Sequence, residues 1–280
     1  MKTAKYSAIH LWQLRSISAI ALLALLQASA TAQGPDSATA LRRLAFIKGR
    51  FTLMTTDPLQ QVYTVDANNS VYKYNPSGQL LFQYNDNRLG RLGAIDASNP
   101  FNVLLYYPDY QIAVTLDRTL NKTGAFQLFQ LGPVNPVAVA LSNDNHLWLF
   151  DEIASQLRKI GHEGEELARS DNLSLLLGAR PNPVQLSAHG NYIYAADPNL
   201  GVLIFDIFGQ YDRLLPLPGV DYCQAFDYYL LCRRSELFEL IDTRTMETKS
   251  VAIPAPGKAL RVERGLWFVL MEDGVGVYRE

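Results

Sequence analysis

The sequence has few of the residues from which catalytic and metal sites are commonly built. Only two of its 280 residues are cysteine and four are histidine, and they form no C-x-x-C or H-E-x-x-H pattern. The sequence also lacks G-x-S-x-G, G-x-G-x-x-G and P-loop motifs. A redox or zinc motif, a nucleophile-elbow hydrolase and a nucleotide-binding loop therefore have no support in the sequence.

The sequence also lacks an excess of charge of either sign. It has 25 Lys and Arg against 27 Asp and Glu, a net charge of -2. This balance gives no basic surface for nucleic-acid phosphates, so we expect no nucleic-acid partner. With 48% hydrophobic and 19% charged residues the chain is not disordered, collagen-like or a disulfide-dense mini-protein. Its 15 Tyr, together with β-branched residues, favour strands.

Long hydrophobic runs are absent too, and the longest apolar run lies near the N-terminus. Lys2, Lys5 and Arg15 make a basic start, residues 17–26 form an apolar run of ten, and small-x-small sequences follow up to Ala32. A membrane helix needs about 20 apolar residues, so this run is too short to span a bilayer. The three features together predict a signal peptide over residues 1–32 that is cleaved near Ala32.

Cleavage there removes three cations and changes the net charge from -2 to -5. We expect the remaining residues, 33–280, to form one domain that does not span the membrane. The expected location is the periplasm or the extracellular medium.

The rest of the chain repeats itself at intervals of about 40 residues. Residues 61–81, 146–167 and 191–214 each contain an apolar strand that ends in Asp, a polar turn, a second strand and a turn with Gly. Residues 101–124 follow the same pattern loosely. Self-similarity of this length with four short strands per unit is typical of a β-propeller blade.

Six such units can be laid out, which predicts an all-β, six-bladed propeller of four-stranded antiparallel blades. The last unit contains only three strands before the sequence ends, whereas residues 41–48 form a strand-like segment left over at the other end. We therefore expect this segment to complete the last blade and close the ring, which removes exposed sheet edges. An open solenoid is the alternative. The blades are expected to begin near Arg50, Gly90, Pro133, Asn182, Asp221 and Gly257.

Two of these units resemble NHL-type and related six-bladed propeller repeats, as found in proteins of the bacterial envelope. The resemblance is carried by the strand-final Asp66 and Asp151, the apolar pairs after them, and the turns at Gly78 and Gly164. It implies the architecture more strongly than any activity, because propellers host hydrolases, lyases, oxidoreductases and binding scaffolds. Propellers of the metal-dependent lactonase type hold Ca²⁺ in the central channel, but no matching set of ligands can be identified here.

Acidic residues occupy the same turn, between the second and third strands, in five of the six units. Two interpretations stay open: an acidic rim for a cation or a basic partner, or carboxylates that accept backbone N–H bonds within their own turns. We expect the second, structural role and no metal site. The residues are Asp66, Asp109, Asp151, Asp197 and Asp273.

Both cysteines lie in the fifth unit, in the sequence DYCQAFDYYLLCRR. A two-residue turn at Asp227–Tyr228 would place Cys223 opposite Cys232 in a non-hydrogen-bonded pair, close enough for a disulfide. An oxidising compartment would allow this structural bond to form. The alternative is two buried thiols, because Asp-Tyr is a poor tight-turn pair.

The most unusual candidate for a binding surface is a tyrosine-rich segment in the second unit. Tyr106, Tyr107, Asp109 and Tyr110 are expected in a lengthened turn, where rigid rings provide contact area at a low entropic cost. The alternative is a turn whose tyrosines pack on their neighbours.

The sequence thus favours an exported, non-enzymatic propeller, expected to be monomeric, that binds an envelope or extracellular protein or another macromolecule through its loop faces. It predicts no cofactor and no catalytic residue. The alternative is a lactonase-like hydrolase or lyase that acts in the central channel, with Ca²⁺ as a cofactor.

Overall fold

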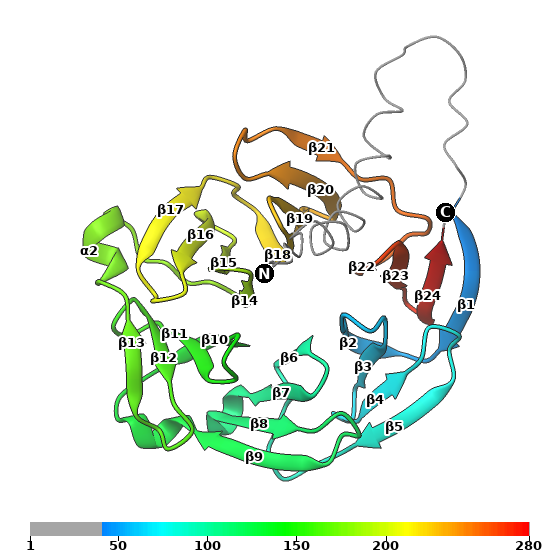
Figure 1. Ribbon diagram of the computed structural model, residues 1–280, viewed down its shortest axis with the longest axis horizontal. Coiled ribbons are helices and arrows are strands. Elements are labelled where there is room, and N and C mark those ends of the chain that lie inside the picture. Colours follow the sequence, from blue (N-terminus) through cyan, green and yellow to red (C-terminus); the bar gives the residue numbers. More distant parts are fainter. Residues whose placement is uncertain (1–40, 280) are drawn as a thin grey trace, which may run out of the picture.

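The computed structural model describes residues 41–279, which form a ring of six four-stranded antiparallel sheets (Figure 1). Each sheet is one blade. In blades one to five the first strand in the sequence lies innermost, whereas in blade six the innermost strand is β22 (Ala259–Glu263) and the outermost is β1 (Arg42–Lys48). The predicted six-bladed propeller is confirmed. Residues 1–40 and 280 lie outside the described residues, and the predicted signal peptide is among them.

The first three blades, in order from the innermost strand to the outermost, consist of the following strands: blade one, β2 (Phe51–Thr56), β3 (Val62–Asp66), β4 (Val71–Tyr74) and β5 (Leu80–Tyr84); blade two, β6 (Ala94–Asn99), β7 (Asn102–Tyr107), β8 (Ile112–Leu116) and β9 (Lys122–Gln127); blade three, β10 (Pro136–Leu141), β11 (Leu147–Asp151), β12 (Gln156–Ile160) and β13 (Glu166–Arg169). The other three are blade four, β14 (Gln185–His189), β15 (Tyr192–Asp197), β16 (Gly201–Asp206) and β17 (Tyr211–Leu215); blade five, β18 (Val220–Phe226), β19 (Tyr229–Arg234), β20 (Leu237–Asp242) and β21 (Thr248–Ser250); blade six, β22 (Ala259–Glu263), β23 (Leu266–Leu270), β24 (Gly274–Arg279) and β1 (Arg42–Lys48). All six predicted blade starts lie within four residues of the observed inner strands.

The ring closes through the N-terminal strand, as predicted. β1 pairs antiparallel with β24, from Arg42 opposite Arg279 to Lys48 opposite Gly274, and so supplies the outer strand of blade six (Figure 1). The N–H of Gly49 then donates to the carbonyl of Asp273 at 3.0 Å. The two ends of the described chain therefore share one sheet.

The core lies between the blades, because both faces of each sheet pack on a neighbouring sheet. β11 shows this most clearly, since all five of its residues are buried. Trp148 of β11 packs between blades three and four, and Trp267 of β23 packs between blades five and six.

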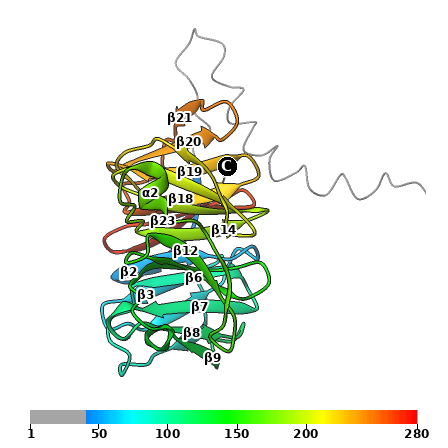
Figure 2. The same ribbon diagram turned by 90° about the vertical axis from the view of Figure 1, so that its left-hand side faces the viewer.

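The antiparallel strands give the ring two distinct faces, and Figure 2 shows the ring from its side. One face carries the turns between second and third strands and the connections between blades; we call it the connection face. Three short helices lie on its loops: η1 (Pro108–Tyr110), η2 (Leu128–Leu131) and α2 (Leu173–Leu177). In the part of the chain that the structure describes, no helix has the length and apolar character needed to cross a membrane.

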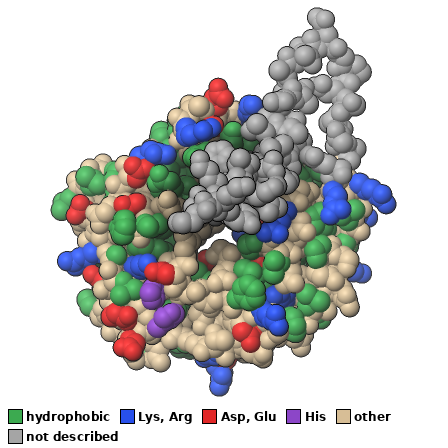
Figure 3. All heavy atoms as spheres, in the orientation of Figure 1, with side chains coloured by type: hydrophobic (Ala, Val, Ile, Leu, Met, Phe, Trp, Pro, Cys, Tyr) green, Lys and Arg blue, Asp and Glu red, His purple; other side chains and the backbone are tan. Residues whose placement is uncertain are grey.

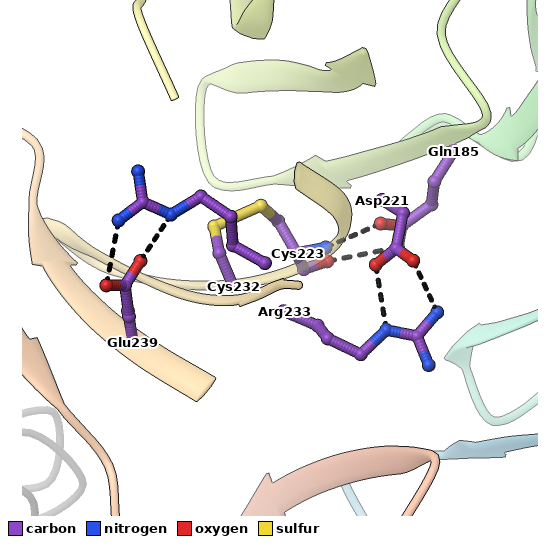
Figure 4. Close-up of a disulfide and its surroundings, with 7 residues drawn as sticks. Gln185, Asp221, Cys223, Cys232, Arg233 and Glu239 are labelled. Carbon is purple, nitrogen blue, oxygen red and sulfur yellow. Dashed lines mark hydrogen bonds and ion pairs between the residues drawn. A yellow bond between two sulfur atoms is a disulfide. The ribbon is translucent and has the colours of Figure 1, made fainter. Parts of the chain in front are cut away.

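The predicted disulfide is present in blade five (Figure 4). The β18–β19 hairpin has the expected register, with Phe226 opposite Tyr229 and Cys223 opposite Cys232, and the two cysteine Cα atoms are 4.2 Å apart. Asp227 adopts a left-handed conformation with φ of 33°, which allows the two-residue turn despite its unusual sequence. Both cysteines are buried, so the bond is a structural staple rather than an exposed redox site.

Candidate functional site

The six inner strands enclose a central channel with a volume of about 1080 Å³. In Figure 3 the opposite face of the ring is turned to the viewer and is hollowed at its centre. Part of the channel wall is apolar, with Met54, Val137, Val139 and Val184 among its residues. The remainder carries polar and charged side chains, and most of the charged ones come from blades five and six.

Two glutamines in this wall bind the free edge of the next blade's inner strand. Gln185 of β14 accepts from the N–H of Cys223 at 2.6 Å and donates to its carbonyl at 3.0 Å (Figure 4). Gln224 of β18 makes the same pair of bonds to Val262 of β22, at 3.0 and 2.9 Å. An inner strand has unpaired backbone groups on its channel side, so each amide satisfies one N–H and one C=O. These side chains join blade four to five and blade five to six.

Two aspartates of the channel wall, Asp96 and Asp221, are also bound to partners. Asp96 of β6 accepts from the N–H of Leu141 at 2.8 Å, which links blade two to blade three. Asp221 forms a two-pronged ion pair with Arg233, at 2.8 and 2.7 Å (Figure 4). Neither carboxylate is free to act on a ligand without first giving up these bonds.

Blade six contributes an arginine whose partners are neutral. One terminal nitrogen of Arg261 donates to the hydroxyl of Tyr222, and the other donates to Oγ1 of Thr55 at 3.0 Å. Its Nε atom is buried without a hydrogen-bond partner. Burial raises the pKa of Tyr222, so this hydroxyl stays neutral near pH 7.

Glu263 lies two residues beyond Arg261 on the same strand. Its Oε1 atom accepts from Oγ1 of Thr56 and from the amide of Gln224, both at 3.0 Å. The pKa of Glu263 is raised, chiefly because the channel removes the carboxyl group from bulk water; Arg261 opposes the shift. Through Thr56 this side chain joins blade six to blade one.

Glu263→Gln is expected to raise the melting temperature by about 2–4 °C at pH 8 and to leave it unchanged at pH 4. The folded protein binds the Glu263 proton more tightly than the unfolded chain does. This group therefore stabilises the wild type fully below its unfolded pKa of about 4.3, and the contribution is lost as the pH rises through the raised folded pKa. Glutamine keeps an oxygen that can accept both hydrogen bonds but does not ionise.

Thermal melts at both pH values measure this difference. The exposed Glu247 provides the control, because Glu247→Gln should not change the pH dependence. A Glu263→Gln effect of the same size at pH 4 and pH 8 would contradict the prediction.

The turn acids lie on the connection face, where most of them bind backbone groups. Asp66 accepts from the N–H groups of Asn68 and Ser70, and Asp197 accepts from those of Asn182, Asn199 and Leu200. The backbone N–H groups of Asn135 and Ile153 donate to Asp151, and the backbone N–H of Arg91 donates to Asp109. The side chain of Asp273 makes no hydrogen bond within residues 41–279. Over the same residues, no three His, Cys, Asp or Glu side chains come together as possible metal ligands.

The structure separates the four residues of the tyrosine-rich candidate surface. Tyr106 and Tyr107 belong to β7 and are only 3% and 0% exposed, so their expected place in a surface turn is wrong. Tyr106 donates its hydroxyl to the carbonyl of Pro136 at 2.7 Å and thereby joins blade two to blade three. Asp109 and Tyr110 do lie in an exposed turn, η1, and Tyr110 is 57% exposed.

Tyr110 belongs to a larger group of exposed apolar side chains on the connection face. We call this group the apolar arc, and its most exposed member is Leu175 of α2, at 86%. Leu175 projects outward because the preceding Leu173 is buried in the core between blades three and four. The arc consists of Tyr110, Phe129, Ile153, Leu175 and Leu176.

Hydrogen bonds connect the segments that carry the arc. The N–H of Leu128, at the start of η2, donates to the carbonyl of Gln111, directly after η1. At the end of the same connection, Asn135 accepts from the N–H of Glu152, which precedes Ile153. The N–H of Leu173 then donates to the carbonyl of Ser155 and docks α2 on the turn that contains Ile153. The loops that carry the arc are therefore neighbours on the connection face, from blade two to blade four.

The three histidines within residues 41–279 lie on the opposite face, where Figure 3 shows purple side chains near the channel. His146 and His162 pack together with ring centroids 5.0 Å apart, and His162 stacks on Phe126 of blade two at 5.6 Å. His189 ends β14 and lines the channel. The pairing of His146 with His162 joins two turns of blade three.

No family model matches the sequence, and a search of curated proteins finds no match. Solved structures do match. A catalytically inactive virginiamycin B lyase from Staphylococcus aureus, solved with quinupristin, has a TM-score of 0.59 at 13% identity over 86% of this chain and 99% of that one. This chain is a six-bladed β-propeller.

Two further structures have the same kind of likeness to this propeller. A streptogramin B lyase has a TM-score of 0.58 at 13% identity, over 85% of this chain and 96% of that one. The WD40 domain of Pan2 from Neurospora crassa has a TM-score of 0.56 at 10% identity, over 85% and 81% of the two chains. At these identities the likeness is one of fold and does not extend to activity.

Proposed function

We propose that this propeller is an exported, non-enzymatic binding protein that docks an envelope or extracellular protein on its connection face. The observation that carries the proposal is the apolar arc. Exposed apolar side chains that form one continuous surface are typical of protein-binding sites, whereas isolated ones are common on any protein. The arc retains Tyr110 from the tyrosine-rich segment and adds four side chains from three other loops.

Export is supported by two independent features. The basic, apolar and small-residue order of residues 1–32 is that of a signal peptide. The Cys223–Cys232 disulfide favours an oxidising compartment, because cytosolic thiols are kept reduced. Both features are consistent with a periplasmic or secreted protein.

The alternative function is that of a hydrolase or lyase that acts in the channel. The fold likeness to virginiamycin B lyase supports this alternative. An enzyme of this kind needs polar groups that are free to hold substrate or to transfer a proton. Here Gln185, Gln224, Asp96 and Asp221 are each bound to a neighbouring blade or to an arginine. The geometry therefore favours the binding function.

Photo-crosslinking from the arc tests the proposal. A benzoylphenylalanine at position 175 is expected to capture one defined protein from envelope extract, whereas the same group at position 208 should not. Phe208 lies on the opposite face in the turn between the outer strands of blade four, and its exposure of 66% makes it a matched control.

The captured partner, once purified, allows a quantitative test. Leu175→Asp should weaken its binding at least ~10-fold, since a charge at the centre of an apolar interface is costly, whereas Phe208→Asp should change it less than ~2-fold. Equal crosslinking from both faces, or equal affinities of both variants, would show that the arc is not the docking surface.

A further inference from the structure

One arginine of the channel wall, Arg261, hydrogen-bonds only neutral groups and keeps an unused donor. Arg261 donates to the hydroxyls of Tyr222 and Thr55, both neutral groups, and its buried Nε atom has no partner. It forms no ion pair with any carboxylate of residues 41–279. Glu263 and Asp96 supply negative charge nearby, but neither hydrogen-bonds the guanidinium. A buried donor left without a partner is costly to the folded protein.

The carboxylates in the same wall are directed to other partners. Arg233, the other arginine of the wall close to Arg261, has a complete two-pronged pair with Asp221. Asp96 binds a backbone N–H, and Glu263 binds Thr56 and Gln224. The protein thus satisfies each of these groups and leaves Arg261 without a hydrogen-bonded carboxylate and with an unused donor.

The space in front of Arg261 fits a small molecule with an apolar part. The channel volume of about 1080 Å³ is at the upper end of ligand cavities, which are mostly apolar with a few polar groups. Met54, Val139 and Phe226 supply apolar wall, and Lys258 and Arg91 add positive charge where the channel meets the connection face. A carboxylate is the anion whose planar oxygens match a guanidinium best among small organic acids.

We infer that the channel is a second binding site, separate from the apolar arc, in which Arg261 and the Tyr222 hydroxyl hold the carboxylate of a small organic acid. The apolar part of the acid lies against the channel wall. The acid supplies the hydrogen-bonded carboxylate that Arg261 lacks in the protein, so binding should depend on the charge of the acid and not only on apolar contact.

Matched acids and amides test the charge requirement in the unmodified protein. Isothermal titration would use octanoate, 4-phenylbutyrate and N-acetyl-leucine, each beside its primary amide. At least one acid should bind saturably, at least ~10-fold more tightly than its amide, since a charge-assisted hydrogen bond is lost in the amide. Binding of N-acetyl-leucine alone would identify a peptide C-terminus as the source of the carboxylate, and binding of the other two would identify a free acid.

Substitutions then test the position. Arg261→Met should lower the affinity for the best acid to that for its amide. Arg261→Lys should restore part of the difference in affinity between acid and amide, because it keeps the positive charge. Arg264 is the control, because it lines the same channel but lies in the exposed β22–β23 turn. Arg264→Met should change the affinity less than ~2-fold.

Several results would overturn the inference: no saturable binding of any of the three acids, equal binding of acids and amides, or an equal loss in Arg261→Met and Arg264→Met. The outcome is independent of the apolar arc, since Leu175→Asp should leave acid binding unchanged.

Discussion

Replacing Ile47 by aspartate is expected to lower the free energy of unfolding by at least about 4 kcal/mol. Ile47 is 3% exposed in β1, opposite Val275 of β24, and belongs to the core between blades six and one. Removing a buried isoleucine side chain costs about 2–5 kcal/mol, and a buried carboxylate adds its desolvation. The loss should be large because, within residues 41–279, no other strand joins the two ends of the ring in one sheet.

Leu44 of the same strand provides a matched control. It is 45% exposed, so Leu44→Asp should change the free energy of unfolding by less than about 1 kcal/mol. Urea denaturation followed by circular dichroism measures both variants. Deletion of residues 41–48 should be at least as destabilising as Ile47→Asp, and an unchanged melting temperature after the deletion would show that the ring does not depend on this strand.

Trp148→Ala is expected to cost about 3–5 kcal/mol. The indole is 1% exposed, and its far edge lies against blade four, where a Cβ atom built on Gly209 would be only 3.0 Å from it. On its own blade, Nζ of Lys159 lies 5.5 Å from the ring centre. Truncation would therefore leave a cavity between two blades that are held apart by their other contacts.

Phe208→Ala is the control for this substitution, because Phe208 is 66% exposed and lies one residue before Gly209. Its free energy of unfolding should stay within about 0.5 kcal/mol of the wild type. Equal losses in the two variants would show that the turn, rather than the buried ring, is responsible for the stability.

The sequence predicts the architecture well because each blade repeats the same physical requirements. A buried strand, a short polar turn with Asp and a turn with Gly recur in blades one, three and four, as at Asp66 and Gly78 of blade one. The disulfide was predictable for a related reason. Antiparallel register follows from the length of the turn, so counting out from Asp227–Tyr228 places Cys223 opposite Cys232.

Tyr106 and Tyr107 show where this kind of reasoning fails. The layout of the repeat placed the segment in a lengthened turn of blade two, but β7 extends through Tyr107. Both tyrosines are buried between blades, and large rings are as suitable for an inter-blade core as for a recognition loop. Burial depends on the neighbouring blade, and local sequence does not report that contact.

The polar side chains of the channel wall could not be predicted from the sequence for a related reason. Gln224, Arg261 and Glu263 are isolated polar residues in strands that otherwise read as apolar. A propeller brings such residues together only when the ring closes, so no short motif records them. The one available signal was the spacing of 37 residues between Gln224 and Arg261, which the registers of the two hairpins place at the same position of successive blades.

The pairing of β1 with β24 sets the order in which the molecule can be completed. The strand nearest the N-terminus is made first, but its partner is the last strand of the described chain. Contacts between residues so far apart in the chain form slowly, because a long loop must close before they are made. The ring therefore cannot close until β24 has been synthesised, although the first five blades can form before that point.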